Sequence, residues 1–312
     1  MSDAGVWEFV DDRGAAVTAV RKPERVVAYV RAGAALRDLG VTPVAVYGSG
    51  HDGAVLDPVK AGDLEAAGVP YLGPGRSLDE EALRGLRPDL VVEVTYDGKS
   101  PYALDEAVAE RVGVPLVALS VGNETTLGEI IGRFGELGAA LGAAGGGTGP
   151  DTGAGSGVGL GAGSGSRFDE VFGAVEPAED ALRAAVFDGG ADVGVLVLSG
   201  AGRDQVHLAR PHAWPELARL VELGVRVLDP GPGPGANWLT ADWEHAARLR
   251  PDLVLFDSRA NAVQPADLPP VGHARVAPWN PETPPSPAAY ARFFGDLAEA
   301  LRDHRPEAAP PR

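Results

Sequence analysis

One phrase occurs twice in this chain and constrains its fold more than any other feature. Residues 81–92 read Glu-Ala-Leu-Arg-Gly-Leu-Arg-Pro-Asp-Leu-Val-Val, and residues 244–255 read Glu-His-Ala-Ala-Arg-Leu-Arg-Pro-Asp-Leu-Val-Leu. Each copy predicts a short helix that ends before Pro88 or Pro251, followed by an apolar run typical of a buried parallel strand. Two lobes of similar build are therefore expected, with a cleft between them in which a small ligand could bind.

The composition excludes several classes of function. The chain has 312 residues, of which 45% are hydrophobic, a balance that suits two globular lobes. Its net charge of −17 argues against a nucleic-acid or anionic-membrane partner, because both require a positive surface. The absence of cysteine excludes disulfides, thiolate metal ligands and a cysteine nucleophile. No apolar run is long enough for a membrane span.

Strand-like and helix-like patterns alternate along the chain, which predicts an α/β fold of two Rossmann-like lobes with parallel sheets. We expect an N-terminal lobe over 1–142 that opens with a hairpin at 7–20, and a C-terminal lobe over 189–312. Residues 143–166 are rich in glycine and predict a flexible surface insertion. A helical pattern over 167–188 is expected to join the lobes, although Pro177 could break it.

The residues after each strand are the candidates for ligand binding, because ligands of open parallel sheets lie at the carboxyl ends of the strands. Aromatic and arginine side chains dominate this set, which suits a flat, conjugated or anionic ligand held by stacking and forked hydrogen bonds. For each residue singly, capping of a strand end is an equally good interpretation. The candidates are Arg31, Tyr47, Ser49, His51, Tyr96, Arg203, Trp214, Trp238 and Arg259.

Other kinds of site have weaker support. The loop 48–53 fits the pattern G-x-G-x-x-G after a strand, but no helix follows directly to hold a phosphate. The six histidines show no metal-ligand spacing, so neither a metal site nor a protein-bound cofactor is expected. The nucleophile-elbow pattern G-x-S-x-G is absent. His51 and Asp97 are the one plausible acid/base pair for a cytoplasmic enzyme or metabolite-handling protein, which remains the alternative function.

Taken together, the chain resembles the substrate-binding proteins of ABC importers, specifically the helical-backbone group that carries ferric siderophores, haem and cobalamin. The resemblance covers nearly the whole chain and depends on the order of several phrases. These are residues 9–14 (Phe-Val-Asp-Asp-Arg-Gly), 22–27 (Lys-Pro-Glu-Arg-Val-Val), 39–45 (Leu-Gly-Val-Thr-Pro-Val-Ala), both Pro-Asp-Leu-Val segments, and 278–281 (Pro-Trp-Asn-Pro).

The resemblance implies a non-enzymatic monomer, with two lobes joined by one rigid helix and an iron-siderophore or similar metal chelate in the cleft. Iron would belong to the ligand, and the protein would supply stacking and charge. Glu81 and Glu244 match the glutamates that meet the permease dimer, although a carboxylate also suits the start of a helix. The first residues lack a secretory signal or lipid-accepting cysteine, so we expect a cytoplasmic protein, or an extracytoplasmic one if the true start lies upstream.

Overall fold

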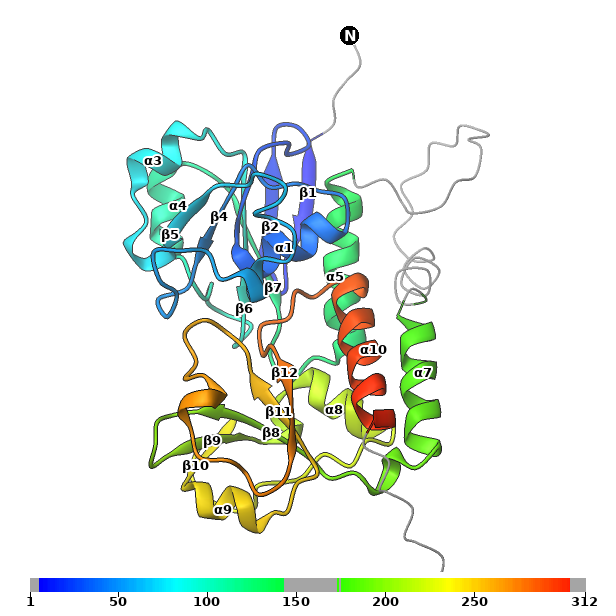
Figure 1. Cartoon of the computed structure of the whole chain (residues 1–312). Coiled ribbons are helices and arrows are strands. Elements are labelled where there is room, and N and C mark those ends of the chain that lie inside the picture. The colour runs from blue at the N-terminus through cyan, green and yellow to red at the C-terminus, as the bar shows by residue number, and fades with distance from the viewer. Residues whose placement is uncertain (1–5, 143–172, 174, 304–312) are drawn as a thin grey trace, which may run out of the picture.

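The structure is a computed structural model that describes residues 6–142, 173 and 175–303. It contains a two-stranded hairpin and two five-stranded sheets, one sheet in each of two lobes. Figure 1 shows the lobes one above the other, with long helices along one side. The predicted insertion at 143–166 and the predicted start of the inter-lobe helix at 167 lie outside the described residues.

The first lobe opens with the predicted hairpin and continues as a parallel sheet in the order β5-β4-β3-β6-β7. Its strands are apolar runs such as β6, which is buried along its whole length, so helices must cover both faces. The strands are β1 (Trp7–Val10), β2 (Ala16–Ala19), β3 (Val26–Tyr29), β4 (Ala45–Gly48), β5 (Tyr71–Pro74), β6 (Leu90–Thr95) and β7 (Leu116–Ser120). The helices are α1 (Val30–Asp38), α2 (Pro58–Ala61), α3 (Glu80–Gly85), α4 (Glu106–Val112) and α5 (Leu127–Ala140).

The second lobe has the sheet order β10-β9-β8-β11-β12, and this sheet is mixed. The prediction of parallel strands was wrong for β9, which pairs antiparallel with both of its neighbours. The short loop between β8 and β9 turns the chain straight back, and this leaves no room for a crossover helix. The strands are β8 (Val195–Gly200), β9 (Val206–Ala209), β10 (Trp238–Ala241), β11 (Leu253–Asp257) and β12 (Arg275–Trp279). The helices are α7 (Glu176–Phe187), α8 (Pro215–Glu222), α9 (Trp243–Arg248) and α10 (Pro287–Asp303).

The repeated phrase forms the same helix and strand in both lobes, α3 with β6 and α9 with β11. Before each proline the chain turns through an arginine with positive φ, 48° at Arg87 and 50° at Arg250. Proline disfavours a helical conformation at the residue before it, so both helices end there. Each following aspartate then accepts backbone hydrogen bonds from the chain beside it, Asp89 from Arg25 and Asp252 from Gly194.

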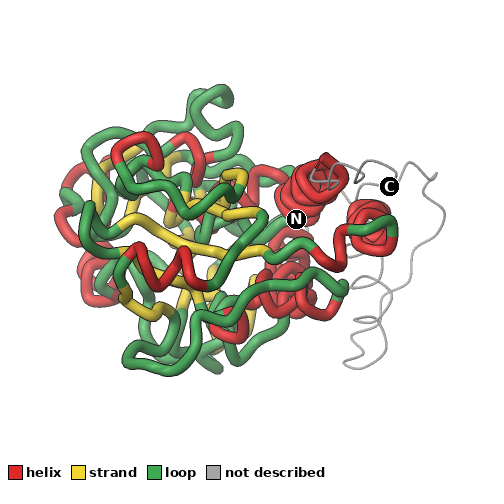
Figure 2. The backbone as a smooth tube through the Cα atoms, turned by 60° about the horizontal axis from the view of Figure 1, so that its bottom comes forward, coloured by secondary structure: helices red, strands yellow, loops and turns green. Residues whose placement is uncertain are grey.

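Helices along one side tie the two lobes together. In α5, Ile130 and Phe134 belong to the core of the first lobe, whereas Leu127 and Ile131 belong to the core of the second. The described part of the predicted inter-lobe helix is α7, which packs lengthwise on α10 (Figures 1 and 2). Pro177 lies in the first turn of α7, where its missing N–H is not needed, and does not break the helix. The two helices that contact both lobes, α5 and α10, therefore fix the spacing of the two sheets.

Candidate functional site

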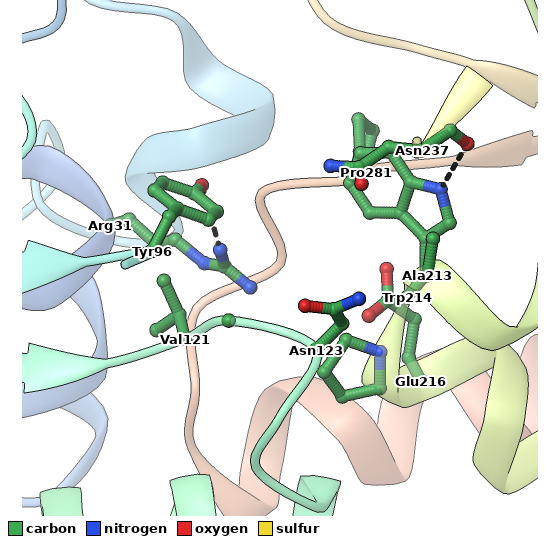
Figure 3. Close-up of a pocket in the computed structure, with 11 residues that line it drawn as sticks. Arg31, Tyr96, Val121, Asn123, Ala213, Trp214, Glu216, Asn237 and Pro281 are labelled. Carbon is green, nitrogen blue, oxygen red and sulfur yellow. Dashed lines mark hydrogen bonds between the residues drawn. The ribbon is translucent and has the colours of Figure 1, made fainter. Parts of the chain in front are cut away.

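A pocket of about 140 Å³ lies between the lobes, beside the carboxyl ends of the first sheet. We call it the inter-lobe pocket; Figure 3 shows its lining. The lining residues are Arg31, Tyr96, Val121, Gly122, Asn123, Ala213, Trp214, Pro215, Glu216, Asn237 and Pro281. A second hollow of about 320 Å³ adjoins it and shares Asn123 and Pro215. The structure thus brings together three of the predicted ligand-binding residues, Arg31, Tyr96 and Trp214.

Arg31 is the charged centre of the first lobe's side of the pocket. It lies in the first turn of α1, directly after β3, and its side chain is only 4% exposed. Its Nε donates to the carbonyl of Thr283 at 3.0 Å, and its Nη1 donates to the Tyr96 hydroxyl at 3.1 Å. The first bond crosses to the other lobe, so Arg31 is held in one orientation before any ligand arrives.

A cluster of three tryptophans lies on the second lobe's side, and Trp214 is its member at the pocket wall. Trp214 contacts the edges of two others, with ring centroids 5.0 Å from Trp238 and 5.4 Å from Trp279. The indole nitrogen of Trp214 donates to the carbonyl of Asn237 at 3.2 Å and fixes the ring at the pocket wall. Such edge-on packing makes a rigid aromatic surface. The predicted residue Trp238 is part of this cluster, although it does not itself line the pocket.

The loop after β7 closes the pocket from the first lobe. Gly122 approaches the backbone of Tyr96 so closely that a Cβ would lie 2.5 Å from the Tyr96 carbonyl oxygen. Only glycine fits there, and this close approach places the exposed amide of Asn123 at the pocket.

Glu216 places a carboxyl group at the second lobe's side, in the first turn of α8. The residue is 2% exposed, and burial raises the pKa of this carboxyl to about 7 although the charge of Arg31 opposes the shift. The indole N–H of Trp279 faces the Glu216 carboxyl and also opposes the shift. Within the described part of the chain, however, neither Glu216 Oε1 nor Trp279 Nε1 makes a hydrogen bond of ordinary geometry.

A buried charge network closes the other end of the lobe interface. Lys60 is fully buried, and its Nζ lies 2.6 Å from Asp52 Oδ1 and 3.0 Å from Glu282 Oε1. Arg259 forms ion pairs of 2.7 Å with Glu282 and with Asp257. Burial alone would raise the pKa of Glu282, but Lys60 and Arg259 outweigh it and lower the pKa to about 2. We call these five residues the inter-lobe charge network.

Several other predicted ligand-binding residues lie in or beside this network. Arg259 is a member of it, and the hydroxyl of Ser49 donates to Asp52 at 2.8 Å. His51 is exposed in the same loop. Tyr47 is fully buried and donates to Glu93 at 2.7 Å, so it does not line the inter-lobe pocket. Arg203 is exposed in the loop after β8, likewise away from the pocket lining.

The alternative function predicted His51 and Asp97 as an acid/base pair, but the surroundings of Asp97 do not suit a general base. The backbone N–H groups of Ser100 and Lys99 donate to Asp97 at 2.8 and 2.9 Å, and the Thr95 hydroxyl donates at 3.0 Å. These bonds lower the pKa of Asp97 to about 2, which makes the carboxylate a poor proton acceptor at neutral pH. The carboxylate acts as a cap for the loop after β6. Among the described residues, no three His, Asp or Glu side chains gather as a metal site.

The two predicted docking glutamates occupy equivalent places. Glu81 and Glu244 are exposed in the first turns of α3 and α9, each just after an aspartate that caps the helix. Figure 1 shows these helices at the far ends of the two lobes. Glu244 forms an exposed ion pair with Arg248 at 3.0 Å.

Sequence reasoning missed Glu216, Asn123 and Trp279 as residues of the site. Glutamate in the first turn of a helix is common, so Glu216 carried no local signal. Trp279 lies at the end of β12 and could have been found by the same rule that found Trp214 and Trp238. Asn123 follows a strand that was predicted correctly, but its position depends on Gly122.

Comparison with solved structures places this geometry among known proteins. No family profile and no curated protein sequence matches the chain. Among solved structures, DesE, a ferric-siderophore receptor protein from Streptomyces coelicolor, has a TM-score of 0.76 and 27% identity, over 95% of this chain and 98% of its own. The periplasmic haem-binding protein RhuT from Roseiflexus sp. RS-1 has a TM-score of 0.59 and 16% identity, over 90% of this chain and 98% of its own.

The periplasmic catecholate-siderophore binding protein VctP from Vibrio cholerae also matches, with a TM-score of 0.59 and 13% identity, over 96% of this chain and 100% of its own. Among the described helices, none has the length and apolarity needed to cross a membrane. The resemblance seen in the sequence is confirmed: the chain has the two-lobed fold of the ABC-importer substrate-binding proteins that include these siderophore and haem receptors.

Proposed function

We propose that this protein binds an iron-siderophore or a similar metal chelate between its lobes, as the substrate-binding protein of an ABC-type importer. The observation that carries the proposal is the inter-lobe pocket, in which a fixed arginine faces a tryptophan wall. Arg31 supplies positive charge and N–H donors for an anionic chelate, and Trp214 supplies a flat surface for its apolar parts. The similarity to DesE across nearly the full length of both chains supports the same class of ligand.

The volume of the pocket limits how such a ligand would sit. Pockets that enclose a drug-sized ligand have volumes of roughly 300–1,000 Å³, whereas the inter-lobe pocket has about 140 Å³. A chelate would therefore place one end in the inter-lobe pocket and extend into the adjoining hollow of about 320 Å³ beside α5 and α8. The protein would contact the organic shell of the chelate, with iron held by the chelate itself.

The proposal extends to location and partner. RhuT and VctP are described as periplasmic, which supports a location outside the cytoplasmic membrane for this chain as well. The exposed Glu81 and Glu244, one at each end of the molecule, would dock on a permease dimer, with one monomer of this protein per transporter.

A fluorescence titration tests the binding function. Trp214 lies at the pocket wall, so a bound ferric chelate should quench its emission. Purified protein is titrated with ferric trihydroxamates, ferric catecholates, haem and cobalamin. We expect saturable quenching at submicromolar concentration by one class, weakened at least ~10-fold by Trp214→Ala, the loss of one stacked aromatic anchor. The matched control is Trp7→Phe in the distant hairpin. A flat response to every chelate would refute the proposal.

A further inference from the structure

One oxygen of the Glu216 carboxyl is poorly satisfied by the protein around it. The residue is 2% exposed, and among the described residues its Oε1 makes no hydrogen bond of ordinary geometry. Buried polar atoms are nearly always well hydrogen-bonded, because one without such bonds loses its bonds to water without full replacement. A poorly paired carboxylate oxygen on a residue of the pocket wall therefore requires an explanation.

The surroundings of Glu216 define what it could bind. Figure 3 shows its carboxylate pointing into the pocket below the indole of Trp214, across from the guanidinium of Arg31. Arg31 from α1 and Tyr290 from α10 are the titratable groups that act on it directly, and Glu282 and Tyr96 act on Arg31. Arg31 donates hydrogen bonds to Thr283 and Tyr96, and its charge acts on Glu216 through space. Glu216 thus has a cation nearby for charge balance, whereas its Oε1 makes no hydrogen bond of ordinary geometry with the described residues.

We propose that Glu216 determines ligand specificity, and that its ionised carboxylate accepts a hydrogen bond from an N–H group of the bound molecule. The donor is either a terminal ammonium or a backbone amide of the chelate. A secondary amide would fit the pocket doubly, because its carbonyl could accept from Arg31 while its N–H donates to Glu216. This inference rests on the proposed binding function and adds the chemistry that the ligand must carry.

The protonation state of Glu216 gives the proposal a pH signature. Burial raises the pKa of this carboxyl to about 7, whereas the pKa values of Arg31 and Tyr290 are raised above their ordinary basic ranges. Among these groups, Glu216 alone changes charge near neutral pH. An N–H donor prefers the ionised carboxylate, so binding should lower the pKa of Glu216. Ligand affinity must then increase as the pH rises through 7.

The test uses two probes, a linear ferric trihydroxamate with a terminal ammonium group and an analogue whose chain ends in a methyl group instead. Dissociation constants are measured by calorimetry from pH 5.5 to 8.5 for the wild type, Glu216→Gln and the control Glu299→Gln. Glu299 is exposed on α10 and lines neither the inter-lobe pocket nor the adjoining hollow. At pH 5.5 a carboxyl with a pKa near 7 is about 3% ionised, so wild-type affinity should rise roughly 30-fold over this range. Glu299→Gln should keep this slope, and Glu216→Gln should lose it.

The two probes distinguish the source of the N–H group. If the ammonium is the donor, the probe that ends in a methyl group binds more weakly to the wild type, and both probes bind Glu216→Gln with equal affinity. If an internal amide is the donor, both probes show the same slope. Wild-type binding with a slope that Glu216→Gln retains would overturn the inference and leave the binding function intact. Failure of both probes to bind the wild type would refute the proposed function for this ligand class, and the inference with it.

Discussion

Buried carboxylates have different surroundings at the two ends of the lobe interface. In the inter-lobe charge network, Glu282 contacts Lys60 and Arg259 and also accepts from the Tyr29 hydroxyl. In the inter-lobe pocket, Glu216 has an oxygen that makes no hydrogen bond of ordinary geometry with the described residues. Because hydrogen-bonded ion pairs fix geometry and unpaired polar groups favour a ligand that can pair them, one end holds the lobes together and the other is available for binding.

The two glutamates show that neighbouring charges, and not burial alone, decide the pKa of a buried carboxyl group. Glu282 is 4% exposed and Glu216 is 2% exposed, yet the pKa of Glu282 is about 2 and that of Glu216 is about 7. Glu282 has two cations in direct contact, whereas the cation nearest to Glu216 is hydrogen-bonded elsewhere. Burial raises both pKa values, and only at Glu282 is it outweighed.

Removing the central cation of the network should have the largest effect. Lys60→Met leaves Asp52 and Glu282 buried without their shared partner. Breaking a buried ion pair in this way costs about 3–5 kcal/mol, so the free energy of unfolding should fall by that amount. Urea denaturation measures it, with exposed Lys99→Met as the control, for which a change within about 0.5 kcal/mol is expected. A loss below about 1 kcal/mol for Lys60→Met would show that the network does not hold the lobes.

The pH dependence of stability should separate the two glutamates. The pKa of Glu216 is higher in the folded protein than its ordinary value near 4.5, so the folded state holds the proton more tightly. This group therefore destabilises the protein as the pH rises from about 4.5 to 7, by roughly 3 kcal/mol. Glu93, whose pKa burial also raises to about 7, contributes with the same sign. Glu216→Gln should reduce the loss of stability between pH 5 and pH 8.

Glu282 should act in a different pH range. Its pKa in the folded protein is depressed, so its contribution is present above pH 4.5 and is lost as the pH falls toward 2. Urea unfolding of Glu282→Gln should thus show the same change in the free energy of unfolding between pH 5 and pH 8 as the wild type. If Glu282→Gln reduced this change and Glu216→Gln did not, the contrast between the two ends would be wrong.

The smallest effect is expected from Arg31→Lys, which keeps the charge of the pocket and removes the forked donor. The bonds from Arg31 to Thr283 and Tyr96 would be lost or weakened, at a cost of about 1–2 kcal/mol of stability. Affinity for the chelate should decrease by roughly 10-fold as the fixed donor is lost. Thermal unfolding and fluorescence titration measure the two effects. A wild-type affinity in Arg31→Lys would mean that charge alone, without orientation, is recognised.

Local pattern predicted much of the fold. The repeated phrase predicted the helix and strand pairs α3 with β6 and α9 with β11. The direction of β9 was missed, although the loop between β8 and β9 is too short for the crossover that a parallel strand needs.

The site was less predictable than the fold. Arg31 and Tyr96 were found because strand ends converge at one edge of a sheet. Tyr47 follows the same rule, yet its side chain turns inward to Glu93, and a sequence pattern does not give the direction of a side chain at a strand end. The role of Glu216 depends on the surroundings of its carboxylate oxygens in the folded protein, a property that no segment of the sequence carries alone.

Hydrogen exchange with and without a saturating ferric trihydroxamate tests the contrast between the two ends most directly. The account predicts slower amide exchange in the loops 121–124 and 213–216, which line the inter-lobe pocket. It also predicts unchanged exchange in 57–61 and 257–260, beside the charge network. Protection confined to the network segments, or none in the pocket loops, would contradict the assignment of the pocket as the ligand site.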